Sequence, residues 1–249
     1  MRRTIPSNRN GWYKLKKAIG VIPARLYSTR FPKKILHKID EKPIIVYVYE
    51  QVKKAKSLND VIVAIDAEET EMALKPFKVK MVMTADTHVS GTDRVQEVVK
   101  DLDADVIVNI QGDEPAIDPT CIDKLVAQFS DESIQMATVA GKNMNVKKLT
   151  DVNTVKVLLD KDGFAVNFRR EPVETEAGGY YHHMGIYAYT KAALENFINF
   201  APSPNEQALK LEQYRALDNG IPIKVILTEK VNIGIDTMDD LKQFMENKW

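Results

Sequence analysis

Short apolar runs alternate with amphipathic segments throughout the first half of the chain. Runs of the length of buried strands lie at 18–23, 61–65, 79–83 and 105–110. Helices are expected between and after them, at 43–55, 68–75, 92–101 and 119–130. Pro43 and Pro119 suit first helical turns, and Asp66 suits the N-cap of the second helix. This alternation predicts an α/β fold with a doubly wound, mostly parallel sheet.

The pattern changes in the second half, where strands are expected at 155–159, 164–168, 184–189 and 223–227. The first three have short connections, which predicts antiparallel additions to the sheet. Residues 171–180 are expected to form a loop, because they contain Pro172 and Gly178-Gly179. Ser203-Pro204-Asn205-Glu206 has the spacing of a capping box and predicts one helix that continues to about Asp218. Thr237 is expected to cap a final helix.

Composition narrows the class of protein. The chain has 249 residues, and its 35 Lys and Arg balance its 35 Asp and Glu. This zero net charge gives no indication of binding to nucleic acid or to an anionic membrane. No apolar run approaches the roughly 18–20 residues of a membrane span. The single cysteine, Cys121, allows no disulfide or Cys-based metal site within one chain, which fits a cytoplasmic location. Residues 1–17 are expected to be a poorly ordered extension, and 18–249 a single domain.

A loop rich in cations follows the first strand. Arg25, Arg30, Lys33 and Lys34 lie there among small and hydroxyl residues such as Ser28. In an open α/β sheet, loops at the carboxyl ends of strands are where ligands bind. Guanidinium and ammonium groups at that edge can share a triphosphate between them. The alternative is a solvated basic loop with no ligand.

Two aspartates far apart in the sequence offer a metal site. Asp113 lies in Gln111-Gly112-Asp113-Glu114-Pro115, directly after a strand, and Asp236 lies in Gly234-Ile235-Asp236-Thr237. Mg²⁺ in proteins typically binds one or two carboxylates together with phosphate oxygens. The two aspartates therefore predict Mg²⁺ bridging protein and nucleotide. The alternative is that each is a turn or cap residue.

Two further segments carry candidate ligand contacts. Ser90 and Gly91 precede a helix, where hydroxyl and amide groups can bind an anion or a sugar, or can simply cap the helix. His182-His183 precedes a strand. Because no third metal ligand is evident, a hydrogen bond from one histidine to a ligand is favoured over a transition-metal site.

Together, these segments resemble those of a known family, the CMP-Kdo synthetases (3-deoxy-manno-octulosonate cytidylyltransferases). The matching motifs stand in the family's order over about residues 18–245. They are Pro23-Ala24-Arg25 with Ser28-Thr29-Arg30, Phe31-Pro32 and Lys34; Ser90-Gly91-Thr92-Asp93-Arg94; Gln111-Gly112-Asp113-Glu114-Pro115; Asn153 with Val155-Lys156-Val157; His183 with Gly185-Ile186-Tyr187; Pro202-Ser203-Pro204; Leu211-Glu212-Gln213; and Gly234 with Asp236-Thr237.

The resemblance implies a GT-A/Rossmann-like nucleotidyltransferase fold and a Mg²⁺-dependent reaction. CTP and Kdo would give CMP-Kdo and pyrophosphate, for lipopolysaccharide synthesis. By position, it implies that Arg25 and Lys34 hold the triphosphate with help from Ser28, and that Asp113 and Asp236 bind Mg²⁺. Gln111 would lie near the cytidine. The sugar acid would be surrounded by Arg170, His183, Glu212 and Gln213. It further implies a homodimer, with residues 150–200 in sugar binding and dimerisation.

Several positions depart from the family pattern. Lys33 replaces a usual glycine and Ile35 a usual proline, while Ala85 and His182 replace usual arginines. These changes leave open a related acceptor, such as 8-amino-Kdo or another acidic sugar. A non-catalytic nucleotide-sugar-binding protein of the same fold is a further alternative. The presence of both Asp113 and Asp236 argues against it, since such a protein would be free to lose either carboxylate.

Overall fold

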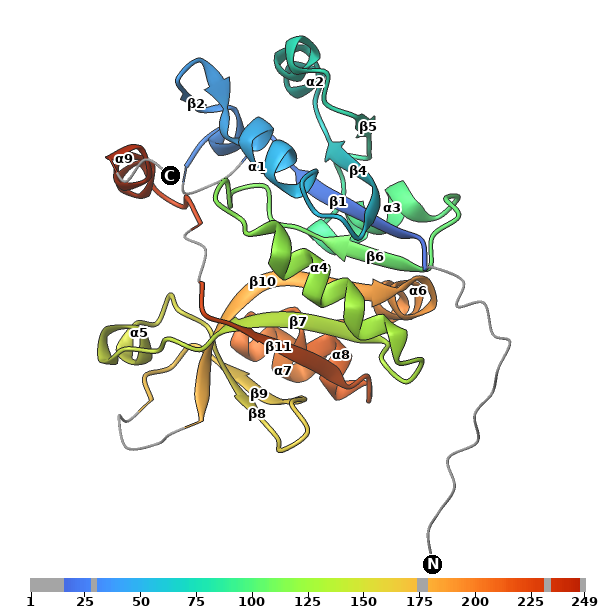
Figure 1. The fold of residues 1–249 in the computed structure, drawn as a ribbon, viewed down its shortest axis with the longest axis vertical. Helices are drawn as coiled ribbons and strands as arrows, with labels where there is room; N and C mark the ends of the chain where they lie inside the picture. The colour runs from blue at the N-terminus through green and yellow to red at the C-terminus, as the bar shows by residue number, and fades with distance from the viewer. Residues whose placement is uncertain (1–15, 28–30, 174–178, 231–233, 247–249) are drawn as a thin grey trace, which may run out of the picture.

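A twisted nine-stranded sheet forms the centre of the molecule in the computed structural model, which describes residues 16–27, 31–173, 179–230 and 234–246 (Figure 1). The strand order is β11-β7-β10-β6-β1-β4-β5, with β8 and β9 joined through β10. The strands are β1 (Ala18–Ala24), β4 (Leu58–Ile65), β5 (Met81–Met83), β6 (Val106–Asn109), β7 (Met136–Gly141), β8 (Lys156–Leu159), β9 (Ala165–Arg169), β10 (Tyr180–Thr190) and β11 (Ile223–Thr228). A separate hairpin consists of β2 (Lys38–Ile39) and β3 (Lys42–Pro43).

The doubly wound, mostly parallel sheet is confirmed. β1 pairs in parallel with β4 on one side and with β6 on the other. The strand order therefore reverses beside β1, which is where a doubly wound sheet opens its ligand crevice. β10 lies antiparallel between β6 and β7, and β8 and β9 are also antiparallel, as expected for the second half.

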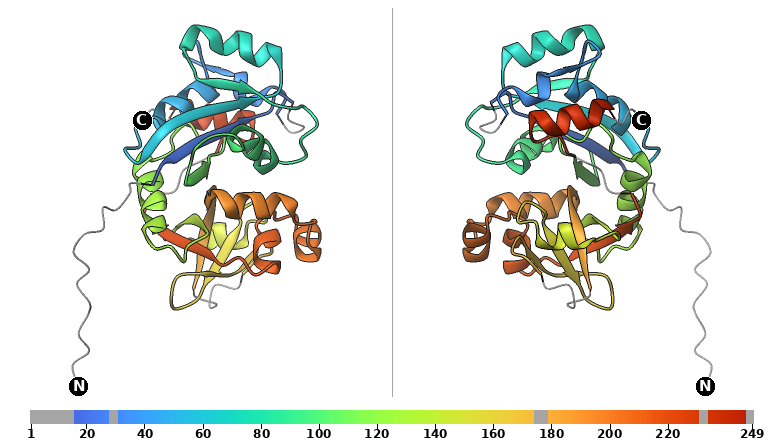
Figure 2. Two further views of the ribbon diagram at one scale, coloured as in Figure 1. Left: turned by 90° about the vertical axis from the view of Figure 1, so that its right-hand side faces the viewer. Right: turned by 90° about the vertical axis from the view of Figure 1, so that its left-hand side faces the viewer.

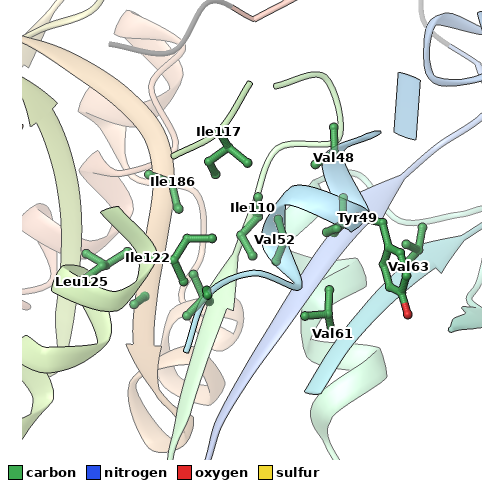
Figure 3. Packing of buried hydrophobic residues seen from close by; sticks show 14 of the residues in the cluster. Val48, Tyr49, Val52, Val61, Val63, Ile110, Ile117, Ile122, Leu125 and Ile186 are labelled. Carbon is green, nitrogen blue, oxygen red and sulfur yellow. The ribbon is translucent and has the colours of Figure 1, made fainter. Parts of the chain in front are cut away.

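Helices cover both faces of the sheet (Figures 1 and 2). They are α1 (Ile44–Val52), α2 (Glu68–Leu74), α3 (Gly91–Val99), α4 (Pro119–Ala127), α5 (Val146–Thr150), α6 (Lys191–Asn199), α7 (Pro204–Leu209), α8 (Tyr214–Asp218) and α9 (Met238–Glu246), with 3₁₀ turns η1 (Lys34–Leu36), η2 (Lys75–Phe77) and η3 (Gln128–Ser130). On one face, Val48 and Val52 of α1 and Ile122 of α4 pack in one apolar cluster with residues of the sheet. These include Ile110, which follows β6, and Ile186 of β10 (Figure 3). On the other, α3 and α6 pack Val95 and Phe197 in a second apolar cluster. None of the described helices combines the length and the apolar character needed to cross a membrane.

The chain ends by returning to its beginning. Leu241 of α9 packs in a small cluster with Phe31, Ile39 and Ile44, so α9 lies beside the hairpin and α1 (Figure 2). The Ile235 amide donates a hydrogen bond of 2.9 Å to the carbonyl of Asp113. This return places Asp236 opposite the end of β6. The expected cap of α9 is confirmed, since the Asp240 amide donates to the Thr237 hydroxyl at 3.2 Å.

The observed elements depart from the sequence-based expectations in three ways. β7, α5 and α6 were not expected at all. The single helix from Ser203 to Asp218 is in fact two, because Lys210 adopts a left-handed conformation (φ 54°) and ends α7. Asp66 does not cap α2, whose N-cap is Ala67. It accepts instead from the Leu26 amide at 2.8 Å and from Arg94 at 3.1 Å, which ties the loop after β1 to α3.

Two expected segments lie partly outside the described residues. They are positions 1–15 of the extension and 174–178 of the loop at 171–180. Lys17 is described, and its backbone amide donates to Asp105 at 2.7 Å.

Candidate active site

A cavity of about 430 Å³ opens at the carboxyl ends of β1 and β6. Its lining brings together residues from five separate segments: Pro23, Arg25, Lys34, Ile35, His88, Val89, Ser90, Gly91, Arg94, Gln111, Gly112, Asp113 and Asp236. Seven of the predicted site residues are therefore neighbours, although they span more than two hundred positions of sequence.

Lys34 is the centre of charge in this cavity. Its ammonium donates to the carboxylate of Asp113 and, at 2.9 Å, to Oδ1 of Asp236. The Lys34 side chain is largely buried, and burial alone would lower its pKa. The two carboxylates outweigh burial and raise the pKa of Lys34 above its ordinary value. Lys34 is thus positively charged at neutral pH. Its ammonium lies between Asp113, which follows β6, and Asp236, which precedes α9.

The two carboxylates fit the Mg²⁺ site that the sequence predicts. Because both contact the same ammonium, they lie close enough together to share a second cation. Among the described residues, no group of three or more His, Cys, Asp and Glu side chains is placed to hold a metal. A two-carboxylate site suits an ion that draws its remaining ligands from phosphate and water, as Mg²⁺ does.

The other predicted cations separate into different roles. Arg25 is exposed and lines the cavity. Lys33 is turned away from it and pairs with Glu69 at 2.7 Å on the surface. Lys33 also has φ 52°, the left-handed conformation in which glycine is favoured. The usual glycine is thus replaced by a lysine that the backbone holds under strain. Ser28 and Arg30 lie outside the described residues.

Ser90 caps α3 and also lies on the wall of the cavity. The Asp93 amide donates to its hydroxyl at 3.1 Å, and its own amide donates to Asp93 at 3.1 Å, so it caps α3 in a capping box. Ser90 and Gly91 also line the cavity, at the positive end of the α3 dipole. The next residue, Thr92, donates to Oε2 of Glu212 at 2.8 Å and links this cavity to a second one.

The second cavity, of about 830 Å³, shares Gln111, Asp113 and Asp236 with the first. The remaining predicted site residues, Arg170, His183, Glu212 and Gln213, all lie in its lining. Glu212 and Gln213 reach it because the chain turns at Lys210 instead of continuing as one helix. Burial raises the pKa of Glu212, against the opposing effect of its hydrogen bond from Thr92. Gln111 lies on the shared wall and donates to the carbonyl of Gly185 at 3.0 Å.

Gly112 is required by packing at the end of β6. A Cβ there would lie 3.0 Å from Cδ1 of Ile45 and 3.1 Å from the backbone oxygen of Pro23. We expect Gly112→Ala to lower the free energy of unfolding by about 1–3 kcal/mol, as overpacking does elsewhere. Turnover should also fall, because the displaced residue precedes Asp113. Urea unfolding measures the first effect. Gly234→Ala is the control, since its Cβ would meet nothing closer than 3.9 Å; equal losses in both variants would refute the packing explanation.

His183 is buried and neutral. Burial lowers its pKa to about 3, and Nε2 lies 3.1 Å from the Thr138 hydroxyl. Because the Thr138 hydroxyl has one proton, and donates to Ile186 at 2.7 Å, His183 Nε2 is the donor of this pair. His183 can therefore offer Nδ1 as an acceptor.

Protonation of His183 is expected to destabilise the fold in acid. The folded pKa is below the unfolded value of 6.5, so full stability is present above pH 6.5 and is lost as the pH falls toward about 3. The loss is about 1.4 kcal/mol for each pH unit while the unfolded chain alone is protonated. Urea unfolding from pH 7 to 4 should show a shallower decline for His183→Gln than for the wild type. His37→Gln is the control; a decline identical in all three proteins would contradict this role.

Lys156 supports the second cavity without lining it, a role that the sequence did not show although the residue stands in a matching motif. Its side chain is fully buried. The ammonium donates to the backbone carbonyls of Asp151 at 2.6 Å and Arg170 at 2.8 Å. It fixes the two segments that carry Asn153 and Arg170 on the wall of the second cavity. The sequence could not show this role, because nothing in the residues around Lys156 indicates that a buried lysine would donate to backbone carbonyls and not to a carboxylate.

Comparison with known proteins agrees with this geometry. The family model of the cytidylyltransferases matches residues 19–229. A 3-deoxy-manno-octulosonate cytidylyltransferase of Geobacter metallireducens is 40% identical over 246 residues, covering 92% of this chain and 97% of the relative. One from Pelobacter propionicus is 42% identical over 242 residues, covering 91% and 95%. The solved structure of a CMP:2-keto-3-deoxy-manno-octonic acid synthetase complexed with CTP is similar with a TM-score of 0.87 and 36% identity, covering 92% of this chain and 97% of that one. The chain therefore belongs to the cytidylyltransferase family, as a nucleotidyltransferase of the 3-deoxy-manno-octulosonate cytidylyltransferase (CMP-Kdo synthetase) type.

Proposed function

We propose that this enzyme transfers the cytidylyl group of CTP to 3-deoxy-D-manno-octulosonate (Kdo), giving CMP-Kdo and pyrophosphate, with Mg²⁺ as cofactor. The observation that carries the proposal is the cluster of Lys34, Asp113 and Asp236 on the wall between two cavities. One cavity is suited to a nucleotide triphosphate and the other to a polar acid. The reaction joins the two ligands at that wall.

The first cavity is assigned to CTP. Arg25 and Lys34 supply positive charge, with Ser28 as a further proposed contact. The first turn of α3 adds the amide end of a helix dipole at Ser90 and Gly91. Gln111 is proposed to lie near the cytidine. A similar solved structure is a complex with CTP, which supports CTP as the nucleotide in this proposal.

The second cavity is assigned to the sugar acid. Arg170 offers a cation, and the neutral His183 offers an acceptor for a hydroxyl. Glu212 has one carboxylate oxygen, Oε1, that is buried with no hydrogen-bond partner among the described residues, and Gln213 Nε2 is in the same state. Buried polar atoms of this kind are costly unless a ligand satisfies them. A polyhydroxylated acid has both donors and acceptors to do so.

The reaction needs no covalent intermediate with the protein. The oxygen of the sugar's anomeric hydroxyl forms a bond to the α-phosphorus as the bond to the β-phosphate oxygen breaks, and the hydroxyl proton is released. Pyrophosphate leaves with the electron pair of the broken bond. Arg25 and Lys34 hold the phosphates and neutralise their charge, which is the main catalytic task in such transfers. When bound at Asp113 and Asp236, Mg²⁺ supplies further neutralisation of phosphate charge and lowers the pKa of a nearby hydroxyl.

A related acid is the alternative acceptor. Ala85 and His182 replace usual arginines, and His182 lines the second cavity. Pyrophosphate release from CTP, measured with Kdo, 8-amino-Kdo and N-acetylneuraminate, decides between acceptors by kcat/KM. Kdo is expected to give the highest value. A higher value for another acid would replace Kdo as the substrate and leave cytidylyl transfer standing.

We also propose the cellular role that the resemblance implies, with the reaction in the cytoplasm and its product used in lipopolysaccharide synthesis. A homodimer formed through residues 150–200 is part of the same proposal. Val152 and Val166 in this region are 55% and 54% exposed, so a partner subunit could cover an apolar side chain at each position. The mass of the protein in solution, measured by light scattering, tests it.

A further inference from the structure

A lysine outside the predicted site residues faces the second cavity. Lys148 lies in α5, whose N-cap Asn145 accepts from the Lys148 amide at 2.9 Å and fixes its place in the first turn. The Lys148 ammonium lies 3.2 Å from Nδ1 of His182 on β10. Burial lowers the pKa of His182 to about 4, so its ring is neutral at pH 7. The ammonium is therefore the donor, and the pair carries one positive charge.

This charge lacks a counter-ion in the part of the chain that the structure describes. Lys148 forms no ion pair there, and its ammonium donates one hydrogen bond, to His182. The nearby carboxylate of Asp151 is engaged elsewhere, accepting from the Asn153 amide at 2.9 Å and the Thr154 hydroxyl at 3.0 Å. One of the three ammonium donors of Lys148 is used, which leaves two for a ligand.

Position distinguishes Lys148 from the other lysines of this region. Lys156 is fully buried, and its donors go to backbone carbonyls. Lys147, the neighbour of Lys148, is exposed and lines neither cavity. Lys148 lines the second cavity together with Arg170 and is absent from the lining of the first. An anion that reaches it therefore belongs to the acceptor and not to the nucleotide triphosphate.

We propose that Lys148, held in place by His182, binds the carboxylate of the sugar acid. The contact adds an ammonium to the guanidinium of Arg170 on the same cavity wall. Partial burial lowers the pKa of Lys148, because the ammonium loses hydration and has no carboxylate partner among the described residues to compensate for that loss. An incoming carboxylate would supply that compensation. This inference rests on the proposed function, because it takes the second cavity to be the acceptor site.

Steady-state kinetics with Kdo and CTP test it in three variants. Lys148→Met should raise the KM for Kdo about tenfold, the usual scale for losing a charged hydrogen bond, and leave the KM for CTP unchanged. Lys148→Arg keeps the charge and should stay within about threefold of the wild type. Lys147→Met removes a charge from the same helix without touching the cavity, and should not change either KM. Calorimetric binding of Kdo without CTP gives the same comparison in the absence of turnover.

The outcomes separate the inference from the function on which it rests. No turnover of Kdo by the wild type would overturn both. Turnover with an unchanged KM for Kdo in Lys148→Met would overturn the inference alone. The inference also fails if the KM for CTP rises equally, if Lys147→Met has the same effect, or if Lys148→Arg is as impaired as Lys148→Met. A rise confined to the KM for Kdo, with rescue by arginine, supports it.

Discussion

Asp113→Asn is expected to lower turnover by two to three orders of magnitude, roughly the loss seen when one electrostatic contact to the transition state is removed. Asp113 contacts Lys34 and lies on the wall shared by both cavities. The asparagine has nearly the same shape but no charge. It would weaken the proposed Mg²⁺ site and release Lys34 from one of its two carboxylates. Single-turnover measurement of CMP-Kdo formation separates this chemical loss from slower binding.

The fold should survive this substitution. The Asp113 side chain is partly exposed at the cavity surface, and its backbone carbonyl, which accepts from the Ile235 amide at 2.9 Å, is unchanged. The unfolding midpoint in urea should therefore stay close to that of the wild type. Asp101→Asn, at an exposed position that lines neither cavity, is the control and should keep full activity. Near-full activity of Asp113→Asn with Mg²⁺ would show that this mechanism is wrong.

Lys34→Met is expected to reduce kcat/KM for CTP by about two orders of magnitude, again on the scale of a lost transition-state contact. Methionine keeps the apolar stem and removes the ammonium. The two carboxylates of Asp113 and Asp236 would then face each other without the cation that now joins them. Both the binding of the triphosphate and the placement of the carboxylates should suffer.

Lys33→Met is the matched control for Lys34→Met. The two lysines are adjacent in sequence, but the Lys33 side chain pairs with Glu69 on the surface and does not line the cavity. Its loss should leave kcat/KM for CTP within about twofold, as is usual for a surface ion pair. Equal losses in the two variants would mean that the loop acts through its total charge. That result would contradict the assignment of the triphosphate contact to Lys34.

The sequence predicted those parts of the fold in which apolar pattern and local chemistry agree. β1, β4 and β6 each contain a run rich in Val and Ile, and Ser90, Ser203 and Thr237 cap helices as their motifs indicate. β7 was missed because Met136–Gly141 is rich in small residues, although all of it is buried. The break after α7 was missed because Lys210 gives no signal for a left-handed turn. Asp66 was misassigned because its partner, Arg94, is distant in sequence.

The candidate site was predictable where a motif carries its own chemistry. Arg25, Lys34, Asp113 and Asp236 stand at strand ends or before a helix, and the strand order brings those ends together. The contact between Lys148 and His182 could not be predicted, since it depends on how α5 folds back over β10. The different contacts of Lys33 and Lys34 could not be predicted either, since their partners, Glu69 for one and Asp113 and Asp236 for the other, are distant in sequence.

Phosphorus NMR of the wild-type enzyme with CTP, Mg²⁺ and Kdo follows both products of the proposed transfer in one experiment. We expect pyrophosphate and a single new phosphodiester to appear in equal amounts, both to require Kdo, and neither to form with Asp113→Asn on the same time scale. Two results would contradict the claim that Lys34, Asp113 and Asp236 join a nucleotide to a sugar acid. One is pyrophosphate release that does not depend on an acidic sugar, and the other is no release with Kdo, 8-amino-Kdo or N-acetylneuraminate.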